Sequence, residues 1–269
     1  MTMNAVRTLF NLEGRVALVT GGAGHLGGVI AETLLEQRCD VVLSDRPGTP
    51  GEARVAQLND AAERQGATFL ACDLLDEADT RALVHRTVEH RGRLDVLVHN
   101  AAYTGTTDVR GWGGPFANQS VEAFEAALRV NTTSAFILAQ EAAPLLARSD
   151  DGAVLLVASI YGIVAPQWSL YEGTTMANPA GYNVSKAGLI QLGRYLATAL
   201  APVRVNVVSP GGIWRNQPEA FQRRYTQRTP LGRMATEDDF RGAVAYLASR
   251  ASAYVTGHNL VVDGGWSVW

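Results

Sequence analysis

The sequence predicts a three-layer α/β fold in which a seven-stranded parallel sheet carries helices on both faces. Short apolar runs alternate with longer stretches of helical periodicity along the whole chain. The short runs are rich in Val, Leu and Ala at consecutive positions, as strands that are covered on both sides require. Polar or Gly/Pro-rich turns separate the segments, and no linker or composition shift divides them, so residues 1–269 are expected to form one domain.

The elements follow in order along the chain. Strands are expected at 15–20, 40–44, 67–71, 94–98, 153–158, 203–208 and 259–262, and helices at 25–37, 51–65, 77–90, 121–146, 181–200 and 237–249. Right-handed crossovers would wind the helices onto both faces, and a ligand would bind beyond the carboxyl ends of the strands. Two long segments, about 162–179 and 211–235, leave strand ends and are expected to cover a substrate pocket.

Composition narrows the function classes. The net charge is −3, which argues against a nucleic-acid-binding protein, because these normally present a strongly basic face. No apolar run approaches the ~18 residues of a membrane span, and the first twelve residues lack the apolar block of a signal peptide, so a cytoplasmic protein is expected. Cys39 and Cys72 lie at the edges of predicted strands and are expected to be buried apolar residues. We expect no metal, and as partners a small molecule and further copies of the chain.

A glycine-rich loop follows the first predicted strand directly and opens a helix. Its residues Gly21, Gly24, His25, Leu26 and Gly27 would allow a tight turn and a close approach of the backbone to a pyrophosphate. Free N–H groups and the dipole of the following helix favour the negative charge of that group. The strand before and the helix after favour a dinucleotide site over an ordinary turn.

The end of the second strand indicates which dinucleotide is bound. Asp45 could accept hydrogen bonds from both adenosine ribose hydroxyls and would repel a 2′-phosphate, which favours NAD over NADP. Arg46 is the opposing observation, because a guanidinium at this position could pair with that phosphate. Asp73, with Leu74, follows the third strand and is expected to contact adenine. Asn100, Ala101 and Ala102 follow the fourth strand and are expected to form a wall of the dinucleotide channel, although each could be a turn residue.

The reactive group is predicted on the helix at 181–200. Tyr182 and Lys186 are four residues apart and therefore share one helix face. A phenol has a pKa of about 10, and a nearby ammonium lowers it by favouring the phenolate; reaching about 7 requires on the order of 4 kcal/mol, to which an oxidised nicotinamide could contribute. Ser159, just past the fifth strand, could orient the substrate oxygen. Asn131 could hold water in a proton path from the lysine.

Together these residues resemble the short-chain dehydrogenase/reductase family, and the similarity runs from Arg15 to Gly265. The resemblance implies a single Rossmann-type domain with NAD(P) bound by the loop at 20–27 and by residues after the sixth strand, namely Pro210, Gly211 and Ile213. It implies an active Asn-Ser-Tyr-Lys group that matches Asn131, Ser159, Tyr182 and Lys186. It also implies a dimer of dimers, paired through the helices at 121–146 and 181–200, with a further subunit interface at the last strand and 266–269.

The chain departs from the family pattern at four places. His25 replaces the middle glycine of the loop, so that the loop also fits the pattern of larger sugar-nucleotide epimerases; chain length and the C-terminal sequence argue against that branch. Ala102 replaces a glycine, and Arg215 replaces a threonine that contacts the nicotinamide amide. The separation of Ser159 from Tyr182 is longer than usual. The added stretch resembles oxidoreductases encoded with flagellin-glycosylation and nonulosonic-acid pathways and could hold a polyhydroxylated substrate through Trp168, Tyr171, Glu172 and Thr174.

These observations predict an NAD-dependent oxidoreductase that acts on a secondary alcohol, a ketone or a sugar carbon. Five basic residues gather in the segment at 211–235: Arg215, Arg223, Arg224, Arg228 and Arg233. They could clamp a substrate phosphate, or they could belong to a solvated helix. A sugar or sugar phosphate is the expected substrate, and a simple secondary alcohol or cyclic ketone stays open. The rival hypothesis is a redox-sensing protein that binds NAD and performs no chemistry.

Overall fold

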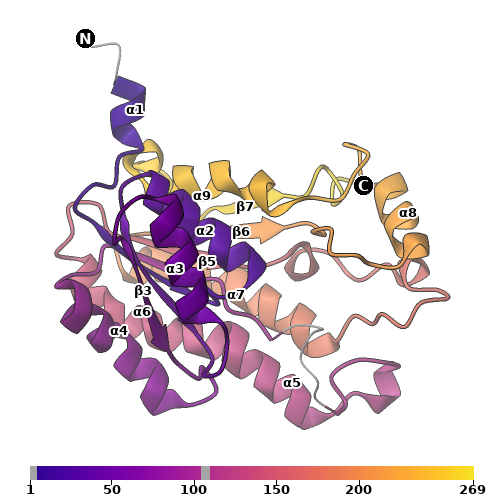
Figure 1. The fold of residues 1–269 in the computed structure, drawn as a ribbon. Helices are drawn as coiled ribbons and strands as arrows, with labels where there is room; N and C mark the ends of the chain where they lie inside the picture. Colours follow the sequence, from indigo (N-terminus) through magenta and orange to yellow (C-terminus); the bar gives the residue numbers. More distant parts are fainter. Residues whose placement is uncertain (1–4, 104–109) are drawn as a thin grey trace.

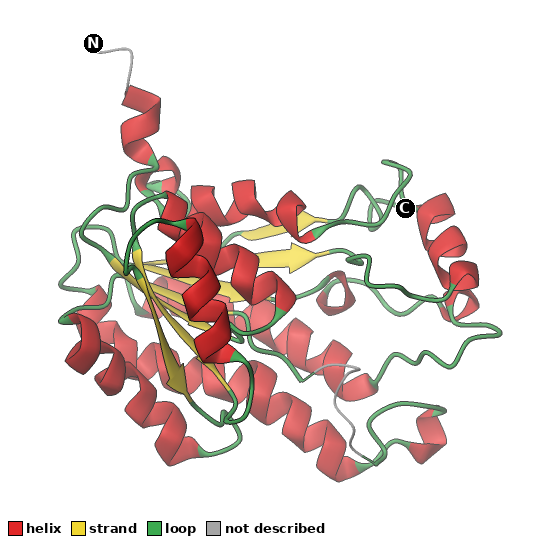
Figure 2. Ribbon diagram, in the orientation of Figure 1, coloured by secondary structure: helices red, strands yellow, loops and turns green. Residues whose placement is uncertain are grey.

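The computed structural model describes residues 5–103 and 110–269, and these contain one seven-stranded sheet (Figure 2). Its strands are β1 (Val16–Thr20), β2 (Asp40–Asp45), β3 (Ala67–Ala71), β4 (Val96–His99), β5 (Ala153–Val157), β6 (Arg204–Pro210) and β7 (Asn259–Val262). They are all parallel, in the order β3-β2-β1-β4-β5-β6-β7. The predicted sheet is confirmed, and the strand order reverses between β1 and β4, where such sheets bind ligands.

Helices cover the sheet on both faces (Figure 1). One hydrophobic core lies between the sheet and α2 (His25–Glu36), α3 (Gly51–Ala61) and α9 (Arg241–Ala248). The other lies beneath α4 (Glu77–Arg91), α6 (Ser134–Leu146) and α7 (Ala180–Ala199). Since both faces are covered, β1, β4, β5 and β6 are buried at every position, which suits the largely apolar sequences of β1, β4 and β5. In β6 the buried polar side chains have partners: Arg204 pairs with Asp151, and Asn206 donates to the carbonyl oxygen of Val255.

Two helices lie outside this arrangement, and three predicted helices differ from those in the structure. The short α1 (Ala5–Leu9) projects from the domain, and α8 (Glu219–Arg228) lies beyond the carboxyl ends of the strands, within the segment at 211–235 (Figure 1). The helix predicted at 121–146 is interrupted: α5 (Val121–Leu128) and α6 are joined by a π-helical turn at Arg129–Thr133. The helix predicted at 51–65 ends at Ala61, and the one at 237–249 begins as a 3₁₀ turn.

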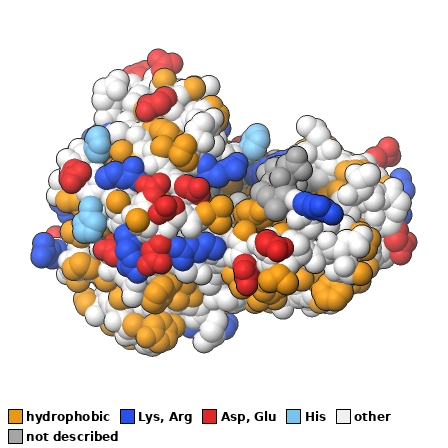
Figure 3. Space-filling view, turned by 90° about the horizontal axis from the view of Figure 1, so that it is seen from below, with side chains coloured by type: hydrophobic (Ala, Val, Ile, Leu, Met, Phe, Trp, Pro, Cys, Tyr) orange, Lys and Arg blue, Asp and Glu red, His pale blue; other side chains and the backbone are white. Residues whose placement is uncertain are grey.

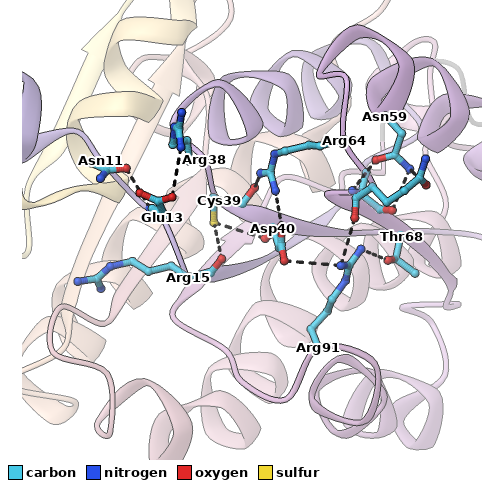
Figure 4. Close-up of polar contacts among 12 residues, drawn as sticks. Asn11, Glu13, Arg15, Arg38, Cys39, Asp40, Asn59, Arg64, Thr68 and Arg91 are labelled. Atoms are coloured by element: carbon cyan, nitrogen blue, oxygen red, sulfur yellow. Dashed lines mark hydrogen bonds and ion pairs between the residues drawn. The ribbon is translucent and has the colours of Figure 1, made fainter.

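Polar contacts secure the amino-terminal edge of the sheet, far from the predicted ligand site (Figure 4). Asp40 forms ion pairs with Arg64 at 2.5 Å and with Arg91 at 3.6 Å. Cys39, beside them, is free and buried, and burial raises the pKa of its thiol; burial likewise raises the pKa of the free thiol of Cys72 to about 12. Both cysteines are therefore unreactive members of the core, as predicted.

The molecular surface carries no large field of one sign on the face formed by the helices around α4. Acidic and basic side chains are interspersed there (Figure 3). Within residues 5–103 and 110–269, no helix combines the length and apolar character needed to cross a membrane.

Candidate active site

A cleft of about 690 Å³ opens beyond the carboxyl ends of the strands, on either side of the β1–β4 switch point. It brings together every predicted site residue except Asn131, from seven separate segments of the chain. Those that line it are Gly21, Gly24, His25, Leu26, Gly27, Asp45, Asp73, Leu74, Asn100, Ala101, Ala102, Ser159, Tyr182, Lys186, Pro210, Gly211 and Ile213.

The glycine loop is shaped so that side chains would not fit. Gly21 has a φ of +66°, and a Cβ on Gly27 would lie 2.0 Å from the carbonyl oxygen of Gly21. Gly24 precedes α2 and offers no side chain to cap its first N–H groups, which therefore remain available to an anion at the cleft. The absence of side chains and the uncapped helix end both fit a bound pyrophosphate.

Asn100 holds this loop against the sheet. Its side-chain amide donates to the carbonyl oxygens of Thr20 at 3.1 Å and Gly21 at 3.2 Å, and its backbone N–H donates to the Thr20 hydroxyl at 3.2 Å. The neighbouring N–H of Ala101 donates to the same hydroxyl. The predicted channel wall thus also fixes the geometry of the phosphate loop.

Two carboxylates lie at the end of the cleft nearest β2 and β3. One oxygen of Asp45 accepts a hydrogen bond from the N–H of Ala23 at 3.1 Å, and the other accepts from the N–H of Arg46 at 2.8 Å. Each carboxylate oxygen retains acceptor capacity for a ribose hydroxyl. Asp73 accepts from the N–H of Leu75 at 3.0 Å. Arg46 lines the same end of the cleft, so the carboxylate and the guanidinium that favour opposite cofactors lie together there.

Tyr182 and Lys186 lie side by side on the first turns of α7. Lys186, the only lysine in the chain, is 1% exposed; its Nζ donates to the carbonyl oxygen of Val157 at 2.7 Å and lies 5.8 Å from the centroid of the Tyr182 ring. Because burial disfavours the ammonium form, the pKa of Lys186 is lowered to about 7. The predicted adjacency of phenol and amine is thus present in the structure.

The electrostatic effect of this pair differs from the one predicted from the spacing. Burial raises the pKa of Tyr182, a hydrogen bond with Ser159 lowers it, the neighbouring phenol of Tyr171 raises it, and the positive charge of Arg215 lowers it. Lys186 is itself desolvated and directs its Nζ at the carbonyl oxygen of Val157 at the end of β5. Arg215, on the segment after β6, is therefore a cleft cation that the sequence interpretation did not connect with Tyr182.

Asn131 lies behind the cleft wall in the π-helical turn and is fully buried. Its side-chain oxygen accepts from the N–H of Tyr103 at 2.6 Å, and its amide donates to the Ser185 hydroxyl at 2.9 Å. Its side chain thus joins the segment after β4 to α7. The sequence identified a polar residue on a core face, but the partners of that residue depend on the break between α5 and α6.

The part of the cleft next to Ser159 is mainly aromatic, which the sequence did not reveal. Tyr171, Phe221, Tyr225 and Trp266 form a series of ring contacts with centroid separations of 5.4 to 5.9 Å. The Tyr225 hydroxyl accepts from the N–H of Gly212 at 2.5 Å and so fixes the backbone after β6. These rings come from segments distant in sequence. The apolar positions of α8 were the available indication, because Phe221 and Tyr225 share one helix face.

Most residues proposed to hold a sugar or phosphate lie outside the cleft. Of the four named in the added stretch, only Tyr171 lines it, and Trp168 is 61% exposed. Of the five arginines, only Arg215 lines it, and that residue pairs with Glu237 at 3.0 Å. The other four have structural partners: Arg223 pairs with Glu219, Arg224 donates to the backbone of Glu172, Arg228 lies over Trp266 and donates to Trp269, and Arg233 pairs with Asp239.

Comparison with known proteins agrees with this geometry. A family model described as enoyl-(acyl carrier protein) reductase matches residues 22–267. A D-arabinitol 2-dehydrogenase (ribulose-forming) of Scheffersomyces stipitis is 32% identical, over 97% of this chain and 96% of that protein. A 3-oxoacyl-[acyl-carrier-protein] reductase of rhamnolipid biosynthesis from Pseudomonas aeruginosa is 33% identical, over 95% and 97% respectively. The crystal structure of an NADPH-dependent 3-quinuclidinone reductase from Rhodotorula rubra superposes with a TM-score of 0.87, at 27% identity, over 100% of this chain and 97% of that one.

These matches span the whole sheet and both walls of the cleft, and the similar proteins are named dehydrogenases and reductases. The names of these relatives describe the oxidation of CH–OH groups or the reduction of the corresponding carbonyls, and the family they share uses a nicotinamide cofactor. The chain therefore belongs to the short-chain dehydrogenase/reductase family.

Proposed function

We propose that the chain is an NAD-dependent oxidoreductase that interconverts a secondary alcohol and its ketone, with Tyr182 as the general acid and base. The observation that carries this proposal is the presence of Tyr182, Lys186 and Ser159 in the same cleft as the phosphate-binding loop. When bound, the nicotinamide supplies or accepts the hydride. The rival hypothesis, a sensor that binds NAD without chemistry, is not favoured, because the similar proteins are named dehydrogenases and reductases.

Each residue of the cleft has a defined part in this proposal. The loop of Gly21 and Gly27 holds the pyrophosphate against the amino end of α2. Ser159 hydrogen-bonds the substrate oxygen, and Tyr182 gives a proton to that oxygen in ketone reduction or removes one in alcohol oxidation. Lys186 keeps a buried amine beside the phenol, and its remaining N–H bonds are available to ribose hydroxyls. Asn131 holds α7 in register with the segment after β4.

The preference for NAD rests on Asp45, whose carboxylate would accept from the ribose hydroxyls and repel a 2′-phosphate. Arg46 at the same position, and a solved relative that is NADPH-dependent, support the opposite preference. We give Asp45 the greater influence on cofactor preference because its carboxylate is fixed by two backbone N–H groups, whereas the Arg46 side chain is exposed.

The substrate is proposed to be a secondary alcohol or ketone. A relative that acts on arabinitol supports a sugar or polyol, whereas the aromatic lining supports a less polar compound. The similarity of the added stretch to oxidoreductases of nonulosonic-acid and flagellin-glycosylation pathways stays a prediction.

The dimer of dimers is also a proposal; it is supported by apolar side chains that remain exposed on α5, α6 and α7, among them Val121, Phe136 and Val184. A cytoplasmic location is proposed with it.

Replacing Tyr182 by Phe tests the chemistry. Turnover of any alcohol accepted by the wild type should fall by at least about a hundredfold, the usual worth of a general acid and base. Binding of NADH, followed by fluorescence titration, should change by no more than a few fold, because Phe retains the ring. Tyr254→Phe is the matched control, because that tyrosine is fully exposed and remote from the cleft. Equal NADH production by Tyr182→Phe and wild type would refute the assigned role.

A further inference from the structure

Two tyrosines form a close pair in the aromatic half of the cleft. Tyr161 follows Ser159 by two residues, and Tyr171 comes from the added stretch before α7; both line the cleft. Their hydroxyl oxygens are 2.6 Å apart. The side-chain amide of Asn178, which is 5% exposed, donates to the Tyr171 oxygen at 3.1 Å. Asn178 is in turn held by the amide of Asn183.

The number of protons in this group shows what it can bind. Each phenol has one O–H, and the contact between the two oxygens uses one of these two protons. The amide nitrogen of Asn178 is a donor to the Tyr171 oxygen. It therefore cannot accept the proton of either phenol. Among the described residues, no other side chain or carbonyl accepts a hydrogen bond from either phenol. One phenolic O–H therefore remains for a group that enters the cleft.

Both phenols are neutral donors. Burial raises the pKa of Tyr161 and of Tyr171, so neither is ionised at physiological pH. Both tyrosines line the same cleft as Ser159 and Tyr182, which places the pair beside the proposed reactive group. Hydrogen bonds in series strengthen one another, so donation from Asn178 makes the remaining O–H a better donor.

The surroundings of the pair restrict the rest of the ligand. Met176, Phe221, Tyr225 and Met234 also line this part of the cleft, and the Tyr225 hydroxyl accepts from Gly212. Apart from the O–H of Tyr225, these four side chains present apolar surface and offer no partner for additional hydroxyl groups. A polyol bound here would bury hydroxyls without partners, each at a cost of roughly 1–3 kcal/mol.

We propose that the Tyr161–Tyr171 pair is a specificity-determining site for a substrate that is compact and mainly apolar, and that carries an acceptor oxygen in addition to the reacting carbonyl or carbinol. Such an oxygen belongs to a carbonyl, an ether or an ester. This inference rests on the proposed function for the reacting group, and it adds a second point of recognition that neither Ser159 nor Tyr182 supplies.

Three cyclic ketones provide the test. Cyclohexanone lacks the second acceptor, tetrahydropyran-4-one replaces a ring CH₂ by oxygen with little change of shape, and 1,4-cyclohexanedione extends a carbonyl further into the cleft. Turnover is measured as NADH consumption, and binding to the NADH-loaded protein is measured independently by ligand-detected NMR. Wild type should favour at least one acceptor-bearing ketone over cyclohexanone by about three- to tenfold, the worth of one neutral hydrogen bond.

The variant must remove both hydroxyls, because either phenol alone keeps a free proton. Tyr161→Phe/Tyr171→Phe should bind all three ketones with equal affinity, whereas Tyr254→Phe should retain the preference. The thermal midpoint of the double variant, measured in parallel, verifies folding. Equal binding of the three ketones by wild type overturns the inference without any variant, as does a preference that survives in a folded double variant. Failure to consume NADH with any ketone would count against the proposed function, while the NMR comparison would still decide the role of the tyrosine pair.

Discussion

The pKa of Lys186 can be measured directly, because the chain has no other lysine. Protein labelled with ¹³C at the lysine ε-carbon should give one side-chain resonance, and its chemical shift should titrate with a midpoint near 7 in the cofactor-free protein. An unperturbed lysine has a pKa of about 10.4. The predicted difference arises from burial, because Lys186 is 1% exposed and pairs with no carboxylate within residues 5–103 and 110–269.

This shift has a consequence for stability. A change from 10.5 to about 7 corresponds to about 5 kcal/mol against the buried ammonium. Because the folded pKa is the lower one, the unfolded chain binds more protons between pH 7 and 10.5, and the stability of the wild type rises with pH in that window. A Lys186→Met variant lacks this titration. The free energy of unfolding of the wild type should therefore rise, relative to that of Lys186→Met, by about 2 kcal/mol between pH 7 and pH 9.

Urea unfolding of both proteins at the two pH values measures this change. The exposed Arg194→Met on the same helix is the control, and its difference from wild type should not vary with pH. Addition of NADH should move the lysine resonance midpoint upward, because ribose oxygens would accept from the ammonium. A midpoint near 10 in the free protein, or a Lys186→Met difference that is constant from pH 7 to 9, would refute the argument from burial.

Three further substitutions test the cofactor end and the charge of the cleft. Gly27→Ala should weaken NAD binding by about 1–3 kcal/mol in a calorimetric titration, because its Cβ would lie 2.0 Å from the Gly21 carbonyl; Gly242→Ala, which has no atom within 4 Å, should bind normally. Asp45→Asn should lower the ratio of kcat/KM with NAD to that with NADP by about tenfold or more, and the exposed Asp60→Asn should leave it unchanged; an unaltered ratio in Asp45→Asn would assign the preference elsewhere. Arg215→Gln should move the acid limb of the pH profile of alcohol oxidation to higher pH by a fraction of a unit, since Arg215 lowers the pKa of Tyr182. Arg223→Gln, which also removes a cation, is the control. A shift to lower pH would contradict the effect assigned to Arg215.

The sheet could be predicted from the sequence because its strands are buried on both faces. Apolar runs such as Val16–Thr20 and Ala153–Val157 are only five residues long and rich in Val, and turn residues bound them, which favours strands over buried helices. The residues at the strand ends were then correctly grouped, since parallel strands bring their carboxyl ends to one edge. Asp45, Asn100 and Ser159 line one cleft for this reason.

What the sequence could not provide depends on contacts between distant segments. The π-helical turn at Arg129–Thr133 interrupts a region whose local composition favours one continuous helix. There, the Thr132 hydroxyl donates to the Ser185 carbonyl oxygen at 2.8 Å, and Asn131 bonds to the Ser185 hydroxyl. The arginines at 215–233 likewise gave a local excess of charge, and only tertiary structure shows that their partners include Glu237, Asp239 and the Trp266 ring.

The same desolvation acts in opposite directions on the two reactive groups of α7. It raises the pKa of Tyr182 and lowers the pKa of Lys186, so in both cases it favours the neutral form. A phenol and an amine that are both neutral attract each other little, so burial weakens the electrostatic coupling of this pair. Arg215, which is itself paired with Glu237, offsets part of the rise in the pKa of Tyr182. In the proposed mechanism, an oxidised nicotinamide would add positive charge beside Tyr182 and so favour the phenolate. Proton removal by Tyr182 would then depend on the presence of the cofactor that receives the hydride.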